Sequence, residues 1–235
     1  MGQIFLVRHG QASFGAADYD NLSELGVEQS RILGRWFSQC GLSFDRVVLG
    51  GLRRHRQTAE ACLAQMADVP PAADWVVDPG LDEYDHVEVL DRVRSELTGR
   101  AAAKEFAVVH QENPRRAFQQ MFEIAMDRWM SGKYDHEYRE TWSAFRTRCT
   151  GSVQRLVDDA EPSRRAVVFT SGGPITTIVQ ELLGLSDARA ATLNWTLANS
   201  SVTRLLHQPG LVTLSTLNSY AHLEQLRDAK LITYR

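Results

Sequence analysis

The sequence has few cysteines and no long hydrophobic run. Its three cysteines are far apart, and none forms a Cys-x-x-Cys pair of the kind that binds zinc or cycles between thiol and disulfide: they are Cys40, Cys62 and Cys149. We expect all three to be reduced and buried. No apolar segment approaches the ~20 residues that cross a membrane, and the N-terminal apolar run is too short for a signal peptide. The sequence therefore predicts a soluble, cytoplasmic protein with no membrane partner.

The sequence also has little excess charge. A net charge of −3 argues against a general nucleic-acid binder, so no nucleic-acid partner is predicted. No Walker-type nucleotide loop occurs, and the histidines are too scattered to form a recognisable metal cluster, so we expect no metal and no cofactor. What is present is an ordinary globular composition, 43% hydrophobic and 23% charged over 235 residues. That length suffices for one large domain with an ample core.

A short apolar strand near the N-terminus leads directly into polar groups. Residues 4–7 are typical of a strand that is buried on both faces. Arg8, His9 and Gly10 follow at its carboxyl end, the edge where ligands of open parallel sheets bind. Because an unpartnered buried guanidinium is costly, Arg8 indicates an anion. An imidazole can be neutral near pH 7, so His9 is able to act as a nucleophile or a base.

The second strand–helix junction is strongly basic. Residues 46–49 are typical of a strand, and the helix after them is predicted to run to about Met66. Three arginines lie at the start of that helix: Arg53, Arg54 and Arg56. A basic cluster at a helix N-terminus opposes the helix dipole, so a nearby anion explains it better than a solvated face does. We expect one of the three arginines in a pocket and the other two on the surface.

A glycine-rich turn forms a third junction. Residues 166–170 are typical of a buried strand, and Ser171-Gly172-Gly173-Pro174 leads from it into a helix over 175–183, with the proline at the first helical position. The backbone N–H groups and the positive end of the helix dipole suit this turn to phosphate. Three junctions in one chain thus carry anion-binding chemistry, and we expect them to converge on one oxyanion.

Hydrophobic periodicity predicts the remaining elements. Ser23 is suited to N-cap a helix that runs toward Gly41, and an amphipathic helix covers about 140–159. Short strands are predicted at 75–77, 199–207 and 211–217. A helix from Pro114 to near Gly132 carries a stripe that is most often core packing: Phe118, Met121, Phe122, Ala125, Met126 and Trp129.

These motifs together resemble the histidine phosphatase superfamily, the phosphoglycerate mutase-like enzymes. Leu6-Val7-Arg8-His9-Gly10 is similar to the family signature. The segment Leu52 to Ala59 fits the family pattern Leu-x-Arg-x-x-Gln-Thr-Ala, with Arg54 as its arginine. The resemblance implies an α/β fold in three layers, with a mostly parallel central sheet flanked by helices. It also implies a single domain over residues 1–235 with a helical cap inserted at about 85–140.

The resemblance further implies a metal-independent phosphatase that acts on a small phosphorylated metabolite. His9 would form a phosphohistidine while Glu83 protonates the leaving oxygen, and water would then hydrolyse the intermediate. The groups that would hold the phosphate oxygens are Arg8, Arg54, Ser171 and the Gly172 amide. Two residues of the loop after the signature would lie in the pocket: Gln11 and Ser13. Register assigns the acid to Glu83, with Asp82 and Asp85 as alternatives.

The chain departs from the family at two of these junctions. Gly50-Gly51 stands where Ser-Pro is common, and Ser171 stands where the family has a histidine beside the transferred phosphoryl group. A serine hydroxyl donates one hydrogen bond but carries no positive charge. Loss of a preorganised donor typically costs about a hundred- to a thousandfold in rate. Three interpretations stay open: a slower phosphatase, an enzyme in which another group fills the gap, and a noncatalytic pseudoenzyme that binds a phospholigand.

Two other functions compete with the phosphatase. The mutases of the family share a Glu-Arg-His-Tyr-Gly-Gly run where this chain has Glu83-Tyr84-Asp85-His86-Val87-Glu88. In the loop after the signature they have an Asn and a Gly-Trp, where this chain has Gly15 and Asp18-Tyr19. A phosphoglycerate-type mutase is therefore disfavoured. Ser171 partly resembles the nucleophile elbow of an α/β-hydrolase esterase. Asp187 and either His207 or His222 follow it in the right order, but the glycine two residues before the serine is missing.

The predicted cap is the part of the chain least similar to the family. Four of its residues are candidates for lining a substrate pocket: Trp129, Met130, Tyr134 and His136. Because the cap shapes substrate choice in the family, the sequence does not name the substrate. It is also compatible with an oligomer.

Overall fold

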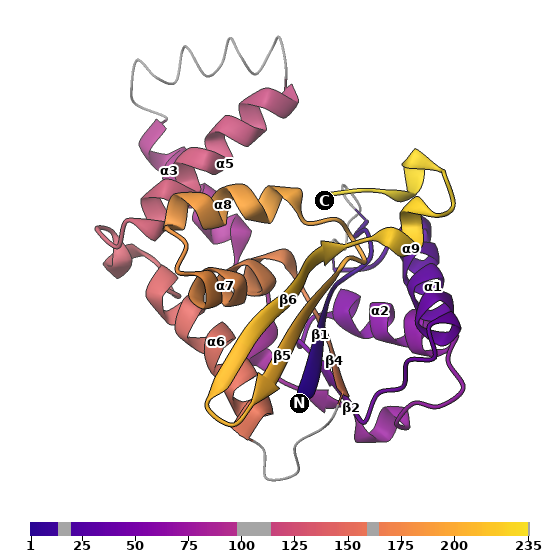
Figure 1. Cartoon of the computed structure of the whole chain (residues 1–235). Helices are drawn as coiled ribbons and strands as arrows, with labels where there is room; N and C mark the ends of the chain where they lie inside the picture. Colours follow the sequence, from indigo (N-terminus) through magenta and orange to yellow (C-terminus); the bar gives the residue numbers. More distant parts are fainter. Residues whose placement is uncertain (14–19, 98–113, 159–164, 235) are drawn as a thin grey trace. The chain divides into compact units, whose positions relative to one another are not determined.

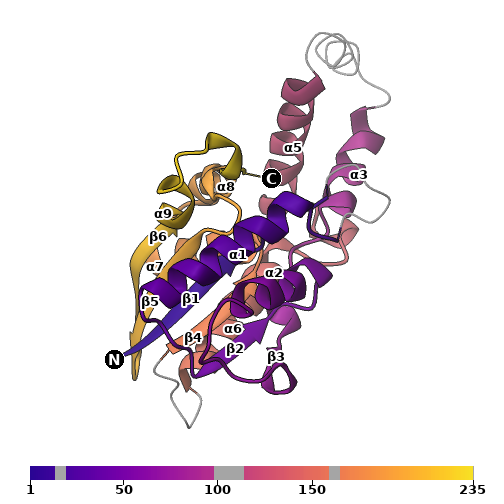
Figure 2. The same cartoon turned by 90° about the vertical axis from the view of Figure 1, so that its right-hand side faces the viewer.

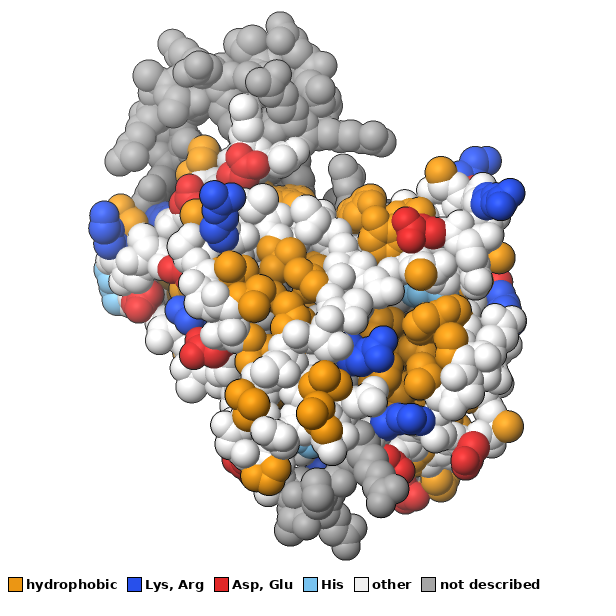
Figure 3. Space-filling view, viewed as in Figure 1, with side chains coloured by type: hydrophobic (Ala, Val, Ile, Leu, Met, Phe, Trp, Pro, Cys, Tyr) orange, Lys and Arg blue, Asp and Glu red, His pale blue; other side chains and the backbone are white. Residues whose placement is uncertain are grey.

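The computed structural model describes residues 1–13, 20–97, 114–158 and 165–234, and the chain forms two compact units. The first consists of Met1–Glu83 and Arg148–Arg235, and the second of Tyr84–Thr147. Within the described residues, no helix is long and apolar enough to cross a membrane. On the face shown in Figure 3, basic and acidic side chains are interspersed among hydrophobic ones, so neither sign of charge dominates its described part.

The first unit is built on a six-stranded sheet with the order β3-β2-β4-β1-β5-β6 (Figure 1). Strands β1 to β4 pair in parallel, whereas β5 pairs antiparallel with both of its neighbours. The predicted mostly parallel sheet is therefore confirmed. The bounds are β1 Gly2–Arg8, β2 Arg46–Leu49, β3 Val76–Val77, β4 Arg165–Thr170, β5 Val202–Gln208 and β6 Leu211–Ser219.

Helices cover both faces of this sheet. Figure 2 shows α1 (Glu24–Gln39) and α2 (Arg53–Leu63) side by side on one face, and α7 (Gly172–Leu183) packs on the other. α8 (Asp187–Thr196) packs against α7, and α9 (Ala221–Glu224) against α1. The central strands β1 and β4 bury every side chain over 4–7 and 166–169. Apolar side chains on both faces of a strand require a layer on each side, which explains the three layers.

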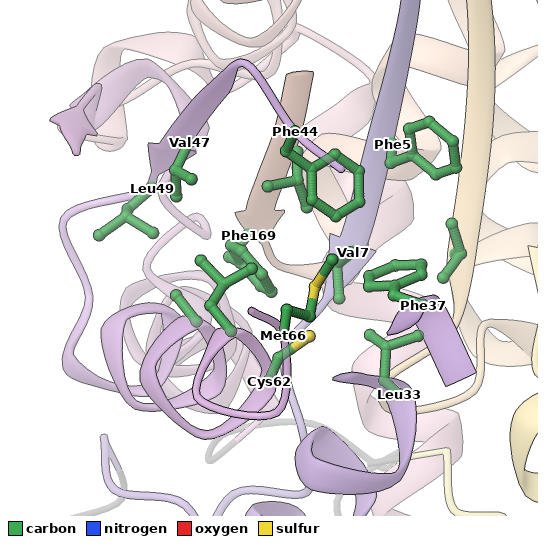
Figure 4. Packing of buried hydrophobic residues seen from close by; sticks show 14 residues of the cluster. Phe5, Val7, Leu33, Phe37, Phe44, Val47, Leu49, Cys62, Met66 and Phe169 are labelled. Carbon is green, nitrogen blue, oxygen red and sulfur yellow. The ribbon is translucent and has the colours of Figure 1, made fainter. Parts of the chain in front are cut away.

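A hydrophobic cluster fills the space between the sheet and helices α1 and α2 (Figure 4). Three aromatic rings in it meet edge to face, with centroids 5.2 to 6.1 Å apart: Phe5, Phe37 and Phe44. Such pairs add about 0.5–1.5 kcal/mol each beyond the area that they bury. Phe169 of β4 and Cys62 of α2 belong to the same cluster, so this thiol behaves as the predicted buried hydrophobe. The cluster anchors the strands whose carboxyl ends carry the polar motifs.

The ends of α1 follow the sequence signals. The Ser23 side chain accepts a hydrogen bond from the Gly26 N–H at the start of the helix. Gly41 follows the last turn with a φ of +63°, a left-handed conformation that glycine adopts at little cost. Cys40 is the C-cap and is exposed, so the prediction that all three cysteines are buried is wrong at this position. The helix ends at the surface, and its last residue takes no part in the core.

Two other helix boundaries differ from the sequence prediction. α2 ends at Leu63 rather than near Met66, because the next residues close i to i+3 hydrogen bonds and tighten the chain into a turn. α7 begins at Gly172, so Pro174 occupies its third position rather than its first. Proline is tolerated throughout the first helical turn, where N–H groups lack helical partners. The predicted helix is thus correct and starts three residues earlier.

The second unit contains α3 (His86–Leu97), which the sequence did not predict, α5 (Pro114–Met130) and the start of α6 (Trp142–Asp158). Trp129 is buried and lies 5.0 to 6.5 Å from four aromatic rings: Tyr84, Tyr138, Trp142 and Phe145. The other described members of the predicted stripe are also buried: Met121, Phe122, Ala125 and Met126. The Phe118 side chain lies outside the described residues. Core packing is therefore confirmed for this stripe, and Trp129, one of the four pocket candidates, is part of it.

Candidate active site

His9 lies at the carboxyl end of β1, and its ring is only 4% exposed. The ring Nδ1 lies 2.7 Å from the carbonyl oxygen of Gly10. A carbonyl oxygen only accepts, so Nδ1 carries the proton and Nε2 is unprotonated in the neutral ring. Burial, followed by the charges of Arg54 and Arg8, holds the pKa of His9 well below 6.5. The imidazole is therefore neutral at pH 7 and has a nucleophilic nitrogen.

Neighbouring elements fix the backbone beside this ring. The Gly10 N–H donates to Thr58 Oγ1 of α2 at 3.1 Å, and Asn199 Nδ2 donates to the His9 carbonyl oxygen at 3.3 Å. A Cβ on Gly10 would lie 2.3 Å from the carbonyl oxygen of Gly26 in α1. Gly10 thus permits the close backbone approach that a glycine at this position predicts.

The two predicted phosphate-binding arginines lie close to His9, since the charge of each lowers the pKa of that histidine. Arg54 in the first turn of α2 is 6% exposed, whereas Arg53 and Arg56 on the same turn are exposed. Burial therefore divides the three arginines as predicted. The charge of Arg54 reaches the His9 ring, whereas the exposed Arg53 donates from Nη1 to Asn21 Oδ1 at 3.3 Å.

Arg54 is paired with a carboxylate. Its Nη1 lies 2.9 Å from Asp20 Oδ1. The same carboxylate accepts the backbone N–H groups of Arg53 at 2.8 Å and of Arg54 at 3.5 Å. Asp20 thereby serves the N-terminus of α2, whose own N-cap residue is Leu52 and makes no side-chain cap bond. One acidic group thus meets a guanidinium and a helix N-terminus, the two features that favour an anion.

Ser171 follows β4 as the N-cap of α7 and is hydrogen-bonded to an imidazole of α2. Its Oγ lies 2.7 Å from His55 Nε2, and both side chains are fully buried. The ring of His55 lies 5.9 Å from that of His9, centroid to centroid. Burial and then the charge of Arg54 lower the pKa of His55 to about 3, against the effect of the Gly50 backbone. The second imidazole near His9 is therefore neutral too.

His55 is the residue here that the sequence motifs missed. It occupies a position that the pattern over Leu52 to Ala59 leaves open, two residues before Gln57. The available signal was helical spacing, because His55 shares the buried face of α2 with Ala59 and Cys62. A titratable side chain on a buried helix face predicts a specific polar partner.

An acidic side chain meets the start of α7. Glu83 Oε2 accepts the Gly173 N–H at 3.2 Å, which brings Glu83 to the turn that the sequence predicts to bind phosphate. A Cβ on Gly172 would lie 3.5 Å from Arg8 Nε, so this turn also adjoins Arg8. The Arg8 guanidinium donates to the carbonyl oxygen of Leu197. The three predicted junctions thus bring their polar groups to one region of the first unit.

The two alternative acids have different contacts. Asp82 accepts the Gly51 N–H, and burial raises the pKa of Asp82 above its usual value of 3.8. Asp85 accepts two backbone N–H groups at the start of α3, at 3.1 and 3.0 Å, and so caps that helix. This contact gives Asp85 a structural role. Of the candidates for the acid, Asp82 and Glu83 contact the polar groups described above.

The predicted pocket-loop residues contact the start of α1. Gln11 Oε1 accepts the Ser23 hydroxyl at 2.9 Å, and the Ser13 N–H donates to the Asn21 carbonyl oxygen at 2.8 Å. Three further residues of this loop lie outside the described residues: Gly15, Asp18 and Tyr19. Gln11 and Ser13 thus form hydrogen bonds that hold this loop against the segment leading into α1.

In the part of the chain that the structure describes, no three His, Cys, Asp or Glu side chains are grouped so as to hold a metal ion.

The structure gives Ser171 a different partner from the one that an esterase elbow requires. Its hydroxyl bonds to His55, not to His207 or His222. Asp187 instead accepts a hydrogen bond from a side chain of α7 at 2.7 Å. Ser171 is therefore not hydrogen-bonded to either histidine of the esterase triad considered from the sequence, and that prediction is wrong.

Comparison with known proteins identifies a family. The model of the histidine phosphatase superfamily (branch 1) matches residues 4–220. The 2,3-bisphosphoglycerate-dependent phosphoglycerate mutase of Corynebacterium glutamicum is 25% identical over 211 residues, which are 82% of each chain. The match thus extends over most of both proteins.

Solved structures share the fold. A phosphoserine phosphatase mutant from Entamoeba histolytica, in complex with phosphoserine, has a TM-score of 0.61 at 18% identity and covers 95% of this chain and 100% of its own. The mycobacterial glucosyl-3-phosphoglycerate phosphatase in complex with VO3 has a TM-score of 0.60 at 22% identity, covering 93% of this chain and 100% of its own. At these identities the likeness concerns the fold.

Proposed function

The chain belongs to the histidine phosphatase superfamily, and from this premise we propose that it hydrolyses a small phosphomonoester through a phosphohistidine on His9. One observation carries the proposal: a buried, neutral imidazole with an unprotonated Nε2 lies beside the guanidinium groups of Arg8 and Arg54. The nitrogen supplies the nucleophile, and the two cations stabilise negative charge on the transferred phosphoryl group.

Two steps complete the reaction. Nε2 of His9 attacks phosphorus, the bond from phosphorus to the leaving oxygen breaks, and Glu83 gives that oxygen a proton. Water then attacks the phosphohistidine, Glu83 takes up the proton of the water, and the N–P bond breaks to release inorganic phosphate. The contact of Glu83 with the Gly173 N–H supports its assignment, because it brings the carboxyl to the start of α7.

The oxygens of the phosphoryl group would be held by Arg8, Arg54, the Ser171 hydroxyl and the Gly172 amide. Their positions support this assignment, since Arg8 adjoins the turn at Gly172 and Ser171 is the N-cap of α7. A helix N-terminus and paired guanidinium groups are suited to a phosphoryl group. We also propose that the second unit, Tyr84–Thr147, is the inserted segment that selects the substrate within one domain.

A mutase is the second candidate, because the relative from Corynebacterium glutamicum carries that name and matches most of the chain. In a mutase the phosphoryl group returns from His9 to a second hydroxyl of the substrate, whereas in a phosphatase it passes to water. With 3-phosphoglycerate as the substrate, a mutase yields an isomer and a phosphatase yields inorganic phosphate. Phosphate release without an isomer would exclude the mutase.

The proposal is tested by rapid quench with a ³²P-labelled phosphomonoester. We expect wild type to accumulate acid-labile, base-stable label on protein and to release phosphate. His9→Ala should do neither, while His222→Ala, which removes a histidine whose ring packs on Trp36, should behave as wild type. Equal turnover by wild type and His9→Ala would contradict the mechanism. Phosphate binding without turnover on a broad panel would indicate a pseudoenzyme.

A further inference from the structure

Ser171 and His55 come from different elements and meet in the interior. The serine lies at the junction of β4 with α7, the histidine lies in the first turns of α2, and neither side chain has measurable exposure. Oγ and Nε2 are 2.7 Å apart, a normal distance for a hydrogen bond that involves a hydroxyl. The His55 ring also lies 5.9 Å from the ring of His9. The pair therefore adjoins the proposed nucleophile.

The Ser171 hydroxyl is not used in the way its position predicts. Ser171 is the N-cap of α7, and serine at this position ordinarily accepts a backbone N–H of the first turn, which is worth about 1 kcal/mol. Its side chain makes no such cap bond. The hydroxyl is instead committed to His55. Because the Ser171 hydroxyl bonds to a buried imidazole instead of capping the helix, its role is other than the stabilisation of α7.

The backbone on the other side of the ring is shaped to admit it. A Cβ on Gly50 would lie 2.3 Å from His55 Nδ1 and 2.9 Å from Asp82 Oδ1. Both distances are shorter than nonbonded contacts allow. Any side chain at position 50 would therefore displace the imidazole. Gly50 thus belongs with His55 and Ser171 in one arrangement.

We propose that His55 is a positioning residue that orients the Ser171 hydroxyl toward a phosphoryl oxygen of the group bound at His9. The neutral ring holds one proton, and in the tautomer that carries it on Nε2 the ring donates to Oγ, which leaves the serine proton to be donated to a phosphoryl oxygen. The ring is neutral at pH 7, so it adds no further charge beside Arg54. The inference rests on the proposed phosphatase function and deepens it at the same site.

Four variants test the positioning role: His55→Leu, His55→Gln, Ser171→Ala and the double variant His55→Leu/Ser171→Ala. We expect His55→Leu and Ser171→Ala each to lower kcat/KM for a phosphomonoester about 10- to 100-fold. The double variant should be no slower than Ser171→Ala alone, because His55 acts only through the hydroxyl. Glutamine places an amide N–H near the position of Nε2, so His55→Gln should recover activity to within about fivefold of wild type.

His222→Leu is the matched control. It also removes a buried imidazole from the first unit, and its ring packs on Trp36 rather than near His9. It should leave kcat/KM unchanged. Thermal unfolding of every variant establishes that it is folded, and if His55→Leu fails to fold, Gly50→Ala displaces the same ring and replaces it in the comparison. Additive losses in the double variant, or wild-type kcat/KM in His55→Leu, would overturn the proposal.

Orthovanadate affinity separates this inference from the proposed function. If wild type shows no turnover, calorimetric titration with orthovanadate replaces kcat/KM in the same double-mutant cycle. Non-additive losses of affinity would then support the positioning role while the phosphatase function fails. Wild-type hydrolysis that is lost in His9→Ala but retained in His55→Leu would support the function and refute the positioning role.

Discussion

Asp20 Oδ1 lies 2.9 Å from Arg54 Nη1, so a carboxylate of this chain holds the guanidinium that we assign to the phosphoryl group. The same carboxylate accepts N–H groups at the start of α2. A bound phosphate would face this carboxylate across a shared cation, and like charges repel. Asp20 is therefore expected to oppose the binding of phosphate.

Asp20→Asn should bind phosphate more tightly. Asparagine keeps an acceptor for the helix N–H groups but removes the charge. We expect inorganic phosphate to inhibit this variant about two- to fivefold more strongly than wild type, in line with a partly exposed ion pair. Inhibition constants at fixed pH and ionic strength measure the effect. Asp45→Asn, remote from Arg54 and bonded to the Arg165 N–H, is the control. Weaker inhibition of Asp20→Asn would contradict the expectation.

Replacing the two candidate acids should distinguish them by leaving group. Glu83→Gln should lower kcat about 10²- to 10⁴-fold for an alkyl phosphate, whose leaving oxygen needs a proton, and much less for p-nitrophenyl phosphate. Asp82→Asn should show no such dependence on the leaving group, although the raised pKa of Asp82 makes it the natural competitor. Steady-state rates on both substrates suffice. If the leaving-group effect follows Asp82, the acid assignment has to be exchanged.

Acid should destabilise the fold through His55. Its pKa is about 3 in the folded chain and 6.5 in the reference state, so below pH 6.5 the unfolded chain takes up a proton that the folded chain does not. The free energy of unfolding then falls by up to ~1.4 kcal/mol per pH unit, or about 2 kcal/mol between pH 6.5 and 5. Urea unfolding of wild type and His55→Gln at both pH values measures this contribution.

His55→Gln should lose less stability than wild type over that interval. A residual loss is expected, because burial also lowers the pKa values of His9 and of His222, the latter to about 4. His222→Gln should therefore reduce the acid sensitivity in the same direction. An identical loss in wild type and His55→Gln would show that His55 does not carry the predicted proton linkage.

Gly34 should be needed where α1 crosses α2. A Cβ there would lie 1.9 Å from the Cys62 carbonyl oxygen, so Gly34→Ala has to push the helices apart and should cost about 1–3 kcal/mol of unfolding free energy. Gly151 in α6 meets only the flexible end of Arg155 at 3.4 Å. Gly151→Ala should be neutral or stabilise by up to ~1 kcal/mol through helix propensity. Urea unfolding compares them, and equal effects would refute the crossing argument.

Local sequence patterns predicted the parts of the site that are set locally. The apolar run over 4–7 and its position at a parallel edge placed His9 at the end of β1, and the family pattern over Leu52 to Ala59 distinguished Arg54 from its exposed neighbours. The family resemblance implied the fold class, and buried strands that alternate with amphipathic helices agree with it. α8 was missed because it buries little: Ala190 is its one residue classed as buried. A helix without an apolar stripe gives no periodic signal.

Contacts between distant segments could not be predicted in this way. His55 and Ser171 are 116 residues apart, and Arg54 and Asp20 are 34 apart. Their pairing depends on how α2, β4 and the loop after β1 come together, and residue spacing within one segment carries no such information. The sequence left open whether another group fills the gap at position 171, and it could not name His55.

The close fit between Gly50 and the His55 ring makes the two positions dependent on the order of change. In a library that varies position 50 in the wild-type background, every residue with a side chain is expected to displace the His55 ring and lower activity. This includes residues that would fit beside a smaller side chain at position 55. Shrinking His55 first opens that space and makes position 50 permissive. The route toward an altered pocket therefore changes position 55 before position 50, and a one-site-at-a-time scan would not find it.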